Sequence, residues 1–129
     1  MGFLTDRRVG LSTALAGADL TEAGALEAVK ALPALVVGPG PSYLDGRILP
    51  TGPGRTGSMQ LRATVVVQAV EPDHGQRGLE DILEAVLDRL PRHWHFDRTD
   101  EPYPVRVGEL AALAAPCYFS TPINYAAST

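Results

Sequence analysis

The sequence has very little cysteine and lysine and no long hydrophobic run, and each shortage excludes a class of protein. Cys117 is the only cysteine in 129 residues, so no internal disulfide can form and an oxidising compartment is not indicated. Lys30 is the only lysine and the formal net charge is −4, so the chain as a whole is not built to attract nucleic acid. No apolar run is long enough to span a membrane, and Arg7 and Arg8 are not followed by the apolar core of a secretory signal. We therefore expect neither a membrane span nor a signal peptide.

The composition that is present is that of a single globular domain. Hydrophobic residues make up 45% of the chain and charged residues 20%, which separates it from disordered sequences. A length of 129 residues suits one modest hydrophobic core. We therefore expect residues 1–129 to fold as one domain, without an internal repeat.

The segment Ser58–Val70 (SMQLRATVVVQAV) has the clearest strand pattern and predicts the centre of a sheet. Apolar residues alternate there with a mixed set, and a strand turns successive side chains to opposite faces. The apolar set, which must be covered, is Leu61, Ala63, Val65, Val67 and Ala69. We expect a helix to cover it.

The segment Gly78–Leu90 predicts that helix. Its apolar residues fall at helical spacing on one face: Leu79, Ile82, Leu83, Val86, Leu87 and Leu90. The other face carries Glu80, Asp81, Glu84, Asp88 and Arg89. The four carboxylates can be interpreted as an acid–base cluster, but catalytic carboxylates need burial to shift a pKa. A solvated helix face is the favoured interpretation, and aspartate at Leu83 or Val65 is expected to disrupt the core.

The other segments complete an α+β fold: a mostly antiparallel β-sheet with helices packed on one face and a long Gly/Pro-rich loop. In Asp6–Ala16 we expect a helix that buries Val9 and Leu11 on one face. Thr21–Leu32 is ambiguous and fits a short helix, and Glu71–Gly78 predicts a turn. Strands are expected at Ala34–Val37, Arg92–Phe96, Tyr103–Leu110 and Cys117–Tyr125. Pro122 places the last strand at a sheet edge or a bulge, because proline cannot donate to a ladder.

The segment Gly38–Gly57 is the longest stretch that predicts no regular structure. Loops of this length in small domains are usually functional or disordered. Its apolar residues need a surface to rest on, and a hairpin turning at Asp45-Gly46 is one way to present them. We expect this loop to become ordered against a neighbouring subunit, where its arginines would face acidic residues of the helix predicted at Gly78–Leu90. The predicted interface is Tyr43, Leu44, Arg47, Ile48, Leu49, Arg55, Glu80 and Glu84.

Three further motifs are weighed against ordinary structural roles. The G-x-G-x-x-G at Gly52–Gly57 lacks the preceding strand and following helix of a dinucleotide site, so a flexible loop is favoured. His93 and His95, with His74 or Asp97, have a spacing that can hold zinc, but exposed polar residues at a subunit contact are favoured. Cys117 is expected to be a small core residue. We therefore predict no catalytic residues, no cofactor and no metal.

Four segments together resemble the tail terminator proteins of long-tailed phages and prophages, also called minor tail or tail completion proteins. They are PALVVGPGPSYL, RATVVVQAV, LEDILEAVLDRL and PCYFSTPINY, and the resemblance runs from about Asp6 to Tyr125. It implies a non-enzymatic structural protein of the virion, assembled in the host cytoplasm. It also implies a homo-hexameric ring that caps the tail tube, stops its growth and docks to the head–tail connector protein. DNA would pass through the lumen without specific binding, which suits an acidic chain.

Other functions stay open at this point. A head-completion or other head–tail connector subunit is a close alternative, and a small ligand-binding or regulatory α+β domain is an alternative of a different class. A small enzyme that uses His93 and His95 is the most distant. Oligomeric state separates these functions: a ring, which needs a contact between two different patches, supports a tail terminator or a connector subunit. A dimer with a closed pocket supports the ligand-binding domain. Bound zinc would favour the enzyme.

Overall fold

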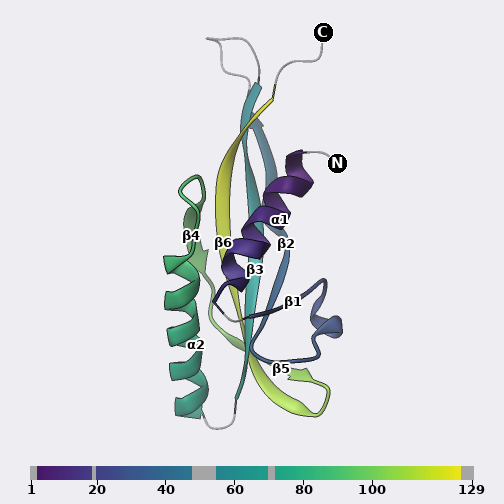
Figure 1. Ribbon diagram of the computed structural model, residues 1–129, viewed down its shortest axis with the longest axis vertical. Coiled ribbons are helices and arrows are strands. Elements are labelled where there is room, and N and C mark those ends of the chain that lie inside the picture. Colours follow the sequence, from purple (N-terminus) through teal and green to yellow (C-terminus); the bar gives the residue numbers. More distant parts are fainter. Residues whose placement is uncertain (1–2, 19, 48–54, 70–71, 126–129) are drawn as a thin grey trace.

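A computed structural model describes residues 3–18, 20–47, 55–69 and 72–125 as a single sheet with two helices packed on one face (Figure 1). The elements in chain order are α1 (Phe3–Ala16), β1 (Thr21–Ala23), the 3-10 helix η1 (Leu26–Ala28), β2 (Ala34–Arg47), β3 (Arg55–Gln68), α2 (Pro72–Asp88), β4 (His95–Thr99), β5 (Tyr103–Val107) and β6 (Leu110–Tyr125). The strand order is β1-β2-β3-β6-β4, with β5 also beside β6. Only the β1–β2 pair is parallel, so the predicted α+β class with a mostly antiparallel sheet is confirmed.

The main core lies between β3 and the two helices, as the alternation in β3 predicts. We call this side of the sheet the helix face. Leu61 lies opposite Phe119 of β6, and Val65 lies opposite Ala115. The helices cover these residues with Leu11 and Leu15 of α1 and Leu79 and Val86 of α2, all of them buried. Because β3 is paired on both sides, its backbone needs no water and its apolar set is removed from solvent.

The opposite face of the sheet carries a second, smaller cluster near the β5 end. Buried residues there are Val29, Ala34, Val66, Ala112 and Ala114. Leu26 of η1 and Val105 of β5 pack against them, so the short segments between the long strands cover this part of the face. Farther along the same face the side chains turn polar, beginning with Thr64 and Gln60 of β3. The mixed set of β3 is therefore covered at one end and polar at the other.

Helix α2 starts earlier than predicted, and each helix leaves one apolar residue exposed that was expected to be buried. Helix α2 begins at Pro72, inside the predicted turn Glu71–Gly78, because proline is well tolerated in the first turn of a helix. Val9 of α1 and Leu87 of α2 were expected on buried faces, yet they are 50% and 41% exposed. Each helix is packed along one side only, and other apolar residues already fill that side.

The predicted long loop is mostly strand. Strand β2 continues to Arg47 and β3 already starts at Arg55. Asp45 and Gly46 pair with β3, so the turn predicted there is wrong, and the connection falls within residues 48–54, which the structure does not describe. A bulge between Pro39 and Leu44 interrupts the pairing. Proline and glycine are tolerated at such bulges and on strands with a free edge.

Three other segments also differ from expectation. Thr21–Leu32 forms the short strand β1 and one 3-10 turn in place of a short helix, because β1 finds a partner in β2. Strand β4 is shifted toward Thr99, and the strand predicted over Tyr103–Leu110 ends at a turn whose Gly108 has φ 62°. Strand β6 runs from Leu110 and lies inside the sheet, so the edge position predicted for it is wrong for most of its length.

Candidate interaction surfaces

The sheet projects past both helices at one end (Figure 1). We call the paired strand segments that lead to this end the strand extension: Leu44–Arg47 of β2, Arg55–Met59 of β3 and Thr121–Tyr125 of β6. Its inner part is still packed, because Met59, Thr121 and Ile123 are buried. Among the described residues no strand pairs with its two outer edges, because β1 pairs with β2 only up to Val36 and β4 pairs with β6 only up to Ser120. Free strand edges are the usual templates for pairing with another chain.

Prolines interrupt both open edges. The Asp100 N–H donates to the Pro116 carbonyl, so Pro116 directs its backbone away from β3. Backbone direction alternates along a strand, and the β3–β6 register is unbroken, so Pro122 faces the same free side. The same reasoning applies to β2, where the Thr21 N–H donates to the Pro33 carbonyl and Pro39 follows in register. Each edge therefore lacks a donor where a new strand would begin to pair.

A polar network ties the bulge of β2 to β4 across the opposite face. Gln60 of β3 lies at its centre and is nearly buried. Its Oε1 accepts a hydrogen bond from the Ser42 N–H at 2.9 Å, and its Nε2 donates to Asp97 at 3.1 Å. The Ser120 hydroxyl also donates to Asp97. Gln60 thus fixes the bulge at which β2 enters the strand extension.

Because of this network, we expect Gly40→Ala to destabilise the protein. A Cβ added there would lie 2.7 Å from Gln60 Oε1 and 2.9 Å from its Cγ, so Gly40→Ala should push Gln60 off its partners. We expect the free energy of unfolding to fall by about 1–3 kcal/mol, the usual effect of leaving buried polar groups unpaired. Chemical denaturation measures it. Gly38→Ala is the matched control, because nothing lies within 4 Å of its added Cβ; equal effects of the two variants would contradict the prediction.

The histidines predicted as alternative zinc ligands are not gathered into a site in the described part of the chain. His95 begins β4, whereas His93 lies in the turn before it and its carbonyl accepts a hydrogen bond from Thr121 at 2.7 Å. Trp94 between them is buried. Among the side chains that the structure describes, no three of His, Cys, Asp or Glu are grouped to hold a metal ion; the side chain of His74 is not among them. Glu80, Asp81, Glu84 and Asp88 of α2 are exposed, as the solvated-face interpretation requires.

Cys117 is a buried thiol on the helix face of β6, as predicted, and 1% of it is exposed. Burial raises the pKa of the Cys117 thiol, and a hydrogen bond from Thr99 opposes the shift. Because the folded pKa lies above the unfolded one, this stabilisation is complete below the unfolded pKa and is lost as the pH rises through the folded pKa. We expect alkaline unfolding curves of wild type to fall more steeply than those of Cys117→Ala. Parallel curves would contradict this.

A groove lies along the outer side of α1. It encloses about 440 Å³ between α1, β1 and the edge of β2. Its lining residues are Arg8, Val9, Ser12, Thr13, Glu22, Ala23, Gly24 and Val37. We call it the α1–β1 groove. The Ser12 hydroxyl donates to Glu22 at 3.1 Å across it, while Arg8 has no ion-pair partner among the described residues.

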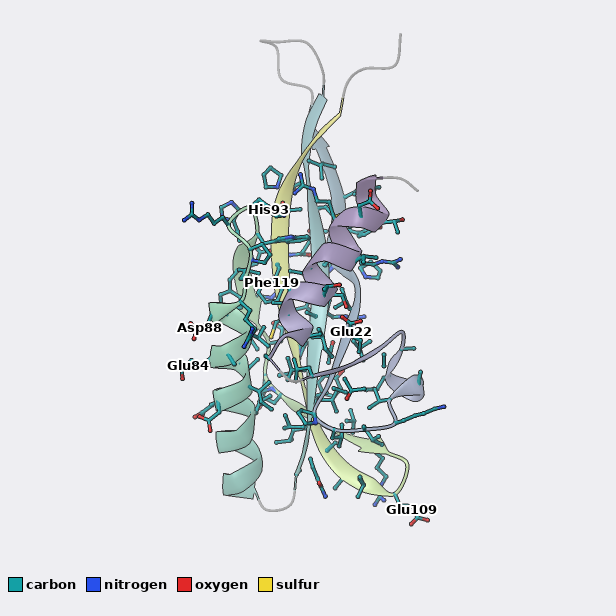
Figure 2. All side chains as sticks on the ribbon, in the orientation of Figure 1. Glu22, Glu84, Asp88, His93, Glu109 and Phe119 are labelled. Carbon is teal, nitrogen blue, oxygen red and sulfur yellow. The ribbon has the colours of Figure 1, made fainter. Side chains whose placement is uncertain are left out.

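The outer side of α2 forms a ridge on the opposite flank of the molecule. We call Glu84, Leu87 and Asp88 the α2 ridge. All three side chains are exposed, and Figure 2 shows Glu84 and Asp88 directed away from the sheet. The ridge therefore presents one apolar side chain beside two carboxylates.

The predicted interface residues are separated in the structure. Tyr43 and Leu44 lie at the β2 bulge and the strand extension, and both are exposed. Arg47 and Arg55 end β2 and begin β3, while Ile48 and Leu49 lie outside the described residues. Glu80 and Glu84 lie on α2, which the strand extension passes beyond (Figure 1). Arg8, Val9 and Leu87 were not predicted as surface contacts from the sequence. Leu87 could have been, because the other apolar residues of its helix are enough to form the buried face.

No known protein family matches the chain, and no curated protein sequence matches it. Among the helices that the structure describes, none combines the length and the apolar character needed to cross a membrane.

Proposed function

We propose that this protein is a tail terminator of a long-tailed phage or prophage: a ring-forming subunit that caps the tail tube, stops its growth and joins it to the head connector. The strand extension carries the proposal. Its outer end projects past both helices (Figure 1), and no described strand pairs with its two outer edges, which suits a surface that lies against the end of a tube. The oligomer is a homo-hexamer by resemblance to that family.

Prolines on the two free edges, Pro39 ahead of the strand extension and Pro122 within it, fit a role in ending a polymer. An open strand edge propagates when each added chain exposes a new edge with free donors. Pro39 and Pro122 remove a donor from the two free edges. The extension can therefore contact a tube end through side chains without continuing the sheet.

The resemblance is concentrated in the centre of the fold. Its four quoted segments fall largely on β2, β3, α2 and β6, which are the three central strands and one helix over them. The net charge of −4 also suits a lumen through which DNA slides, because a lumen without excess positive charge does not hold phosphates.

The test is genetic and structural. The gene is deleted from the phage or prophage that carries it, and the particles are imaged by electron microscopy. We expect overlong tail tubes without heads, and restoration of normal virions by a plasmid copy but not by a copy with Val65→Asp. Tails of normal length beside unattached full heads would indicate a head-completion subunit, and unchanged virions would overturn both.

A further inference from the structure

The α2 ridge can fill the α1–β1 groove through an apolar contact and an ion pair. The ridge carries Leu87, 41% exposed, beside the carboxylates of Glu84 and Asp88. The groove offers apolar contact from Val9, 50% exposed, and the guanidinium of Arg8; its own carboxylate, Glu22, already accepts a hydrogen bond from Ser12. Its volume of about 440 Å³ is ample for one leucine side chain. A carboxylate next to Arg8 would gain a charge-assisted hydrogen bond.

These two surfaces cannot meet within one molecule. Helix α1 packs beside β2 and β1, while α2 packs over β3 and β6. The outer sides of the two helices face away from each other across the helix face (Figure 1). The groove can therefore be filled by the ridge only when the ridge belongs to another copy.

We propose that the α2 ridge of one copy docks into the α1–β1 groove of the next, with Leu87 against Val9 and with Glu84 and Asp88 beside Arg8. This deepens the proposed function, on which it rests, because it names the contact that links neighbouring subunits of the ring. Since ridge and groove are different surfaces, the contact is heterologous and each bound copy presents a new free surface. An assembly built from such contacts stops growing only when the copies close into a ring.

Pairing of like surfaces is disfavoured by the same residues. Two α2 ridges facing each other would bring Glu84 and Asp88 against the same carboxylates, and like charges in contact repel. Two grooves facing each other would leave both hollows unfilled. A closed two-fold dimer through either surface is therefore not expected.

The experiment uses two variants, each blocking one surface. Val9→Asp places a carboxylate in the groove, where it repels the ridge, and Leu87→Asp removes the apolar side chain of the ridge. Glu109→Arg is the control, because Glu109 is an exposed residue at the β5–β6 turn, away from both surfaces (Figure 2). In sedimentation velocity over a concentration series, we expect wild type and Glu109→Arg to form species larger than dimers. Each blocked variant should lose about tenfold or more in association constant, equivalent to at least about 1.4 kcal/mol.

Mixing the two blocked variants gives the decisive result. The Val9→Asp copy keeps an intact ridge and the Leu87→Asp copy keeps an intact groove, so the mixture should form a one-to-one heterodimer that does not grow. Circular dichroism checks that both variants remain folded. A wild type that stays monomeric, blocked variants that assemble like wild type, or a mixture that stays monomeric would each overturn the proposal.

The outcome is separable from the test of the proposed function. If rings form through other surfaces and still cap tails, the docking contact is wrong and the function stands. If the heterodimer forms as expected but deletion of the gene leaves virions unchanged, the contact stands and the function is wrong.

Discussion

Replacing Val65 with aspartate is expected to leave the protein unfolded. Val65 is fully buried at the centre of β3, opposite Leu35 on one side and Ala115 on the other. A carboxylate there would lose its hydration and gain no partner, which costs on the order of several kcal/mol. Total stability of a small domain is only about 5–15 kcal/mol, so the loss removes a large part of it. Circular dichroism and thermal melting measure the result.

The same substitution at Val9 is the control. Val9 is half exposed on α1, so Val9→Asp should keep the carboxylate in water. At a protein concentration where wild type is dissociated, it should leave the melting temperature nearly unchanged. Leu83→Asp should fall between the two, because Leu83 is only partly buried against the core. A folded Val65→Asp protein with the wild-type melting temperature would show that the main core lies elsewhere.

Phe119→Ala is the second substitution with a large expected effect, and it acts by leaving a cavity. Phe119 is fully buried on the helix face of β6, opposite Leu61 and next to Phe96, whose ring centre lies 5.7 Å away. Truncation of a buried phenylalanine costs about 3–5 kcal/mol, because the surroundings relax only partly. Chemical denaturation with an unchanged slope against denaturant concentration would show that stability alone has changed.

Phe96→Ala is the matched control for that cavity. It removes the same atoms from the same aromatic pair, but Phe96 is 44% exposed. We expect a loss of about 1 kcal/mol, mostly the aromatic contact. If Phe96→Ala destabilised the protein as much as Phe119→Ala, the aromatic pair itself and not burial at β6 would be the main contribution.

Local periodicity in the sequence was sufficient for the elements that carry their own hydrophobic pattern. The alternation at Leu61, Ala63 and Val65 predicted both the strand and the face that the helices cover, and the spacing from Leu79 to Val86 predicted the helix. Both patterns hold because burial of a periodic apolar face is favourable whatever the rest of the chain does. From these two segments the α+β class followed.

The candidate surfaces were predicted only in part. Leu44 and Glu84 were named from the sequence as two sides of a contact between neighbouring subunits. Both are exposed and lie on different parts of one molecule, and the contact between them stays a prediction. Val9 was assigned to a buried face and proves to line a groove. Which side of a helix stays exposed depends on the width of the sheet surface on which it packs. That width is set by strands from distant parts of the chain, so a local sequence pattern cannot predict it.

The sequence by itself determined the central strand, the helix over it and the acidic character of that helix's outer face, because each is a property of a short segment. Only the tertiary structure decided that Pro39, Gly40 and Asp45 belong to a strand and that β6 lies inside the sheet. Glycine and proline signal turns locally, but β3 supplies partners that hold the Gly/Pro-rich segment extended. In this segment, hydrogen bonds to a distant strand outweighed the local preference for a turn, because the stability of a strand depends on the strands beside it.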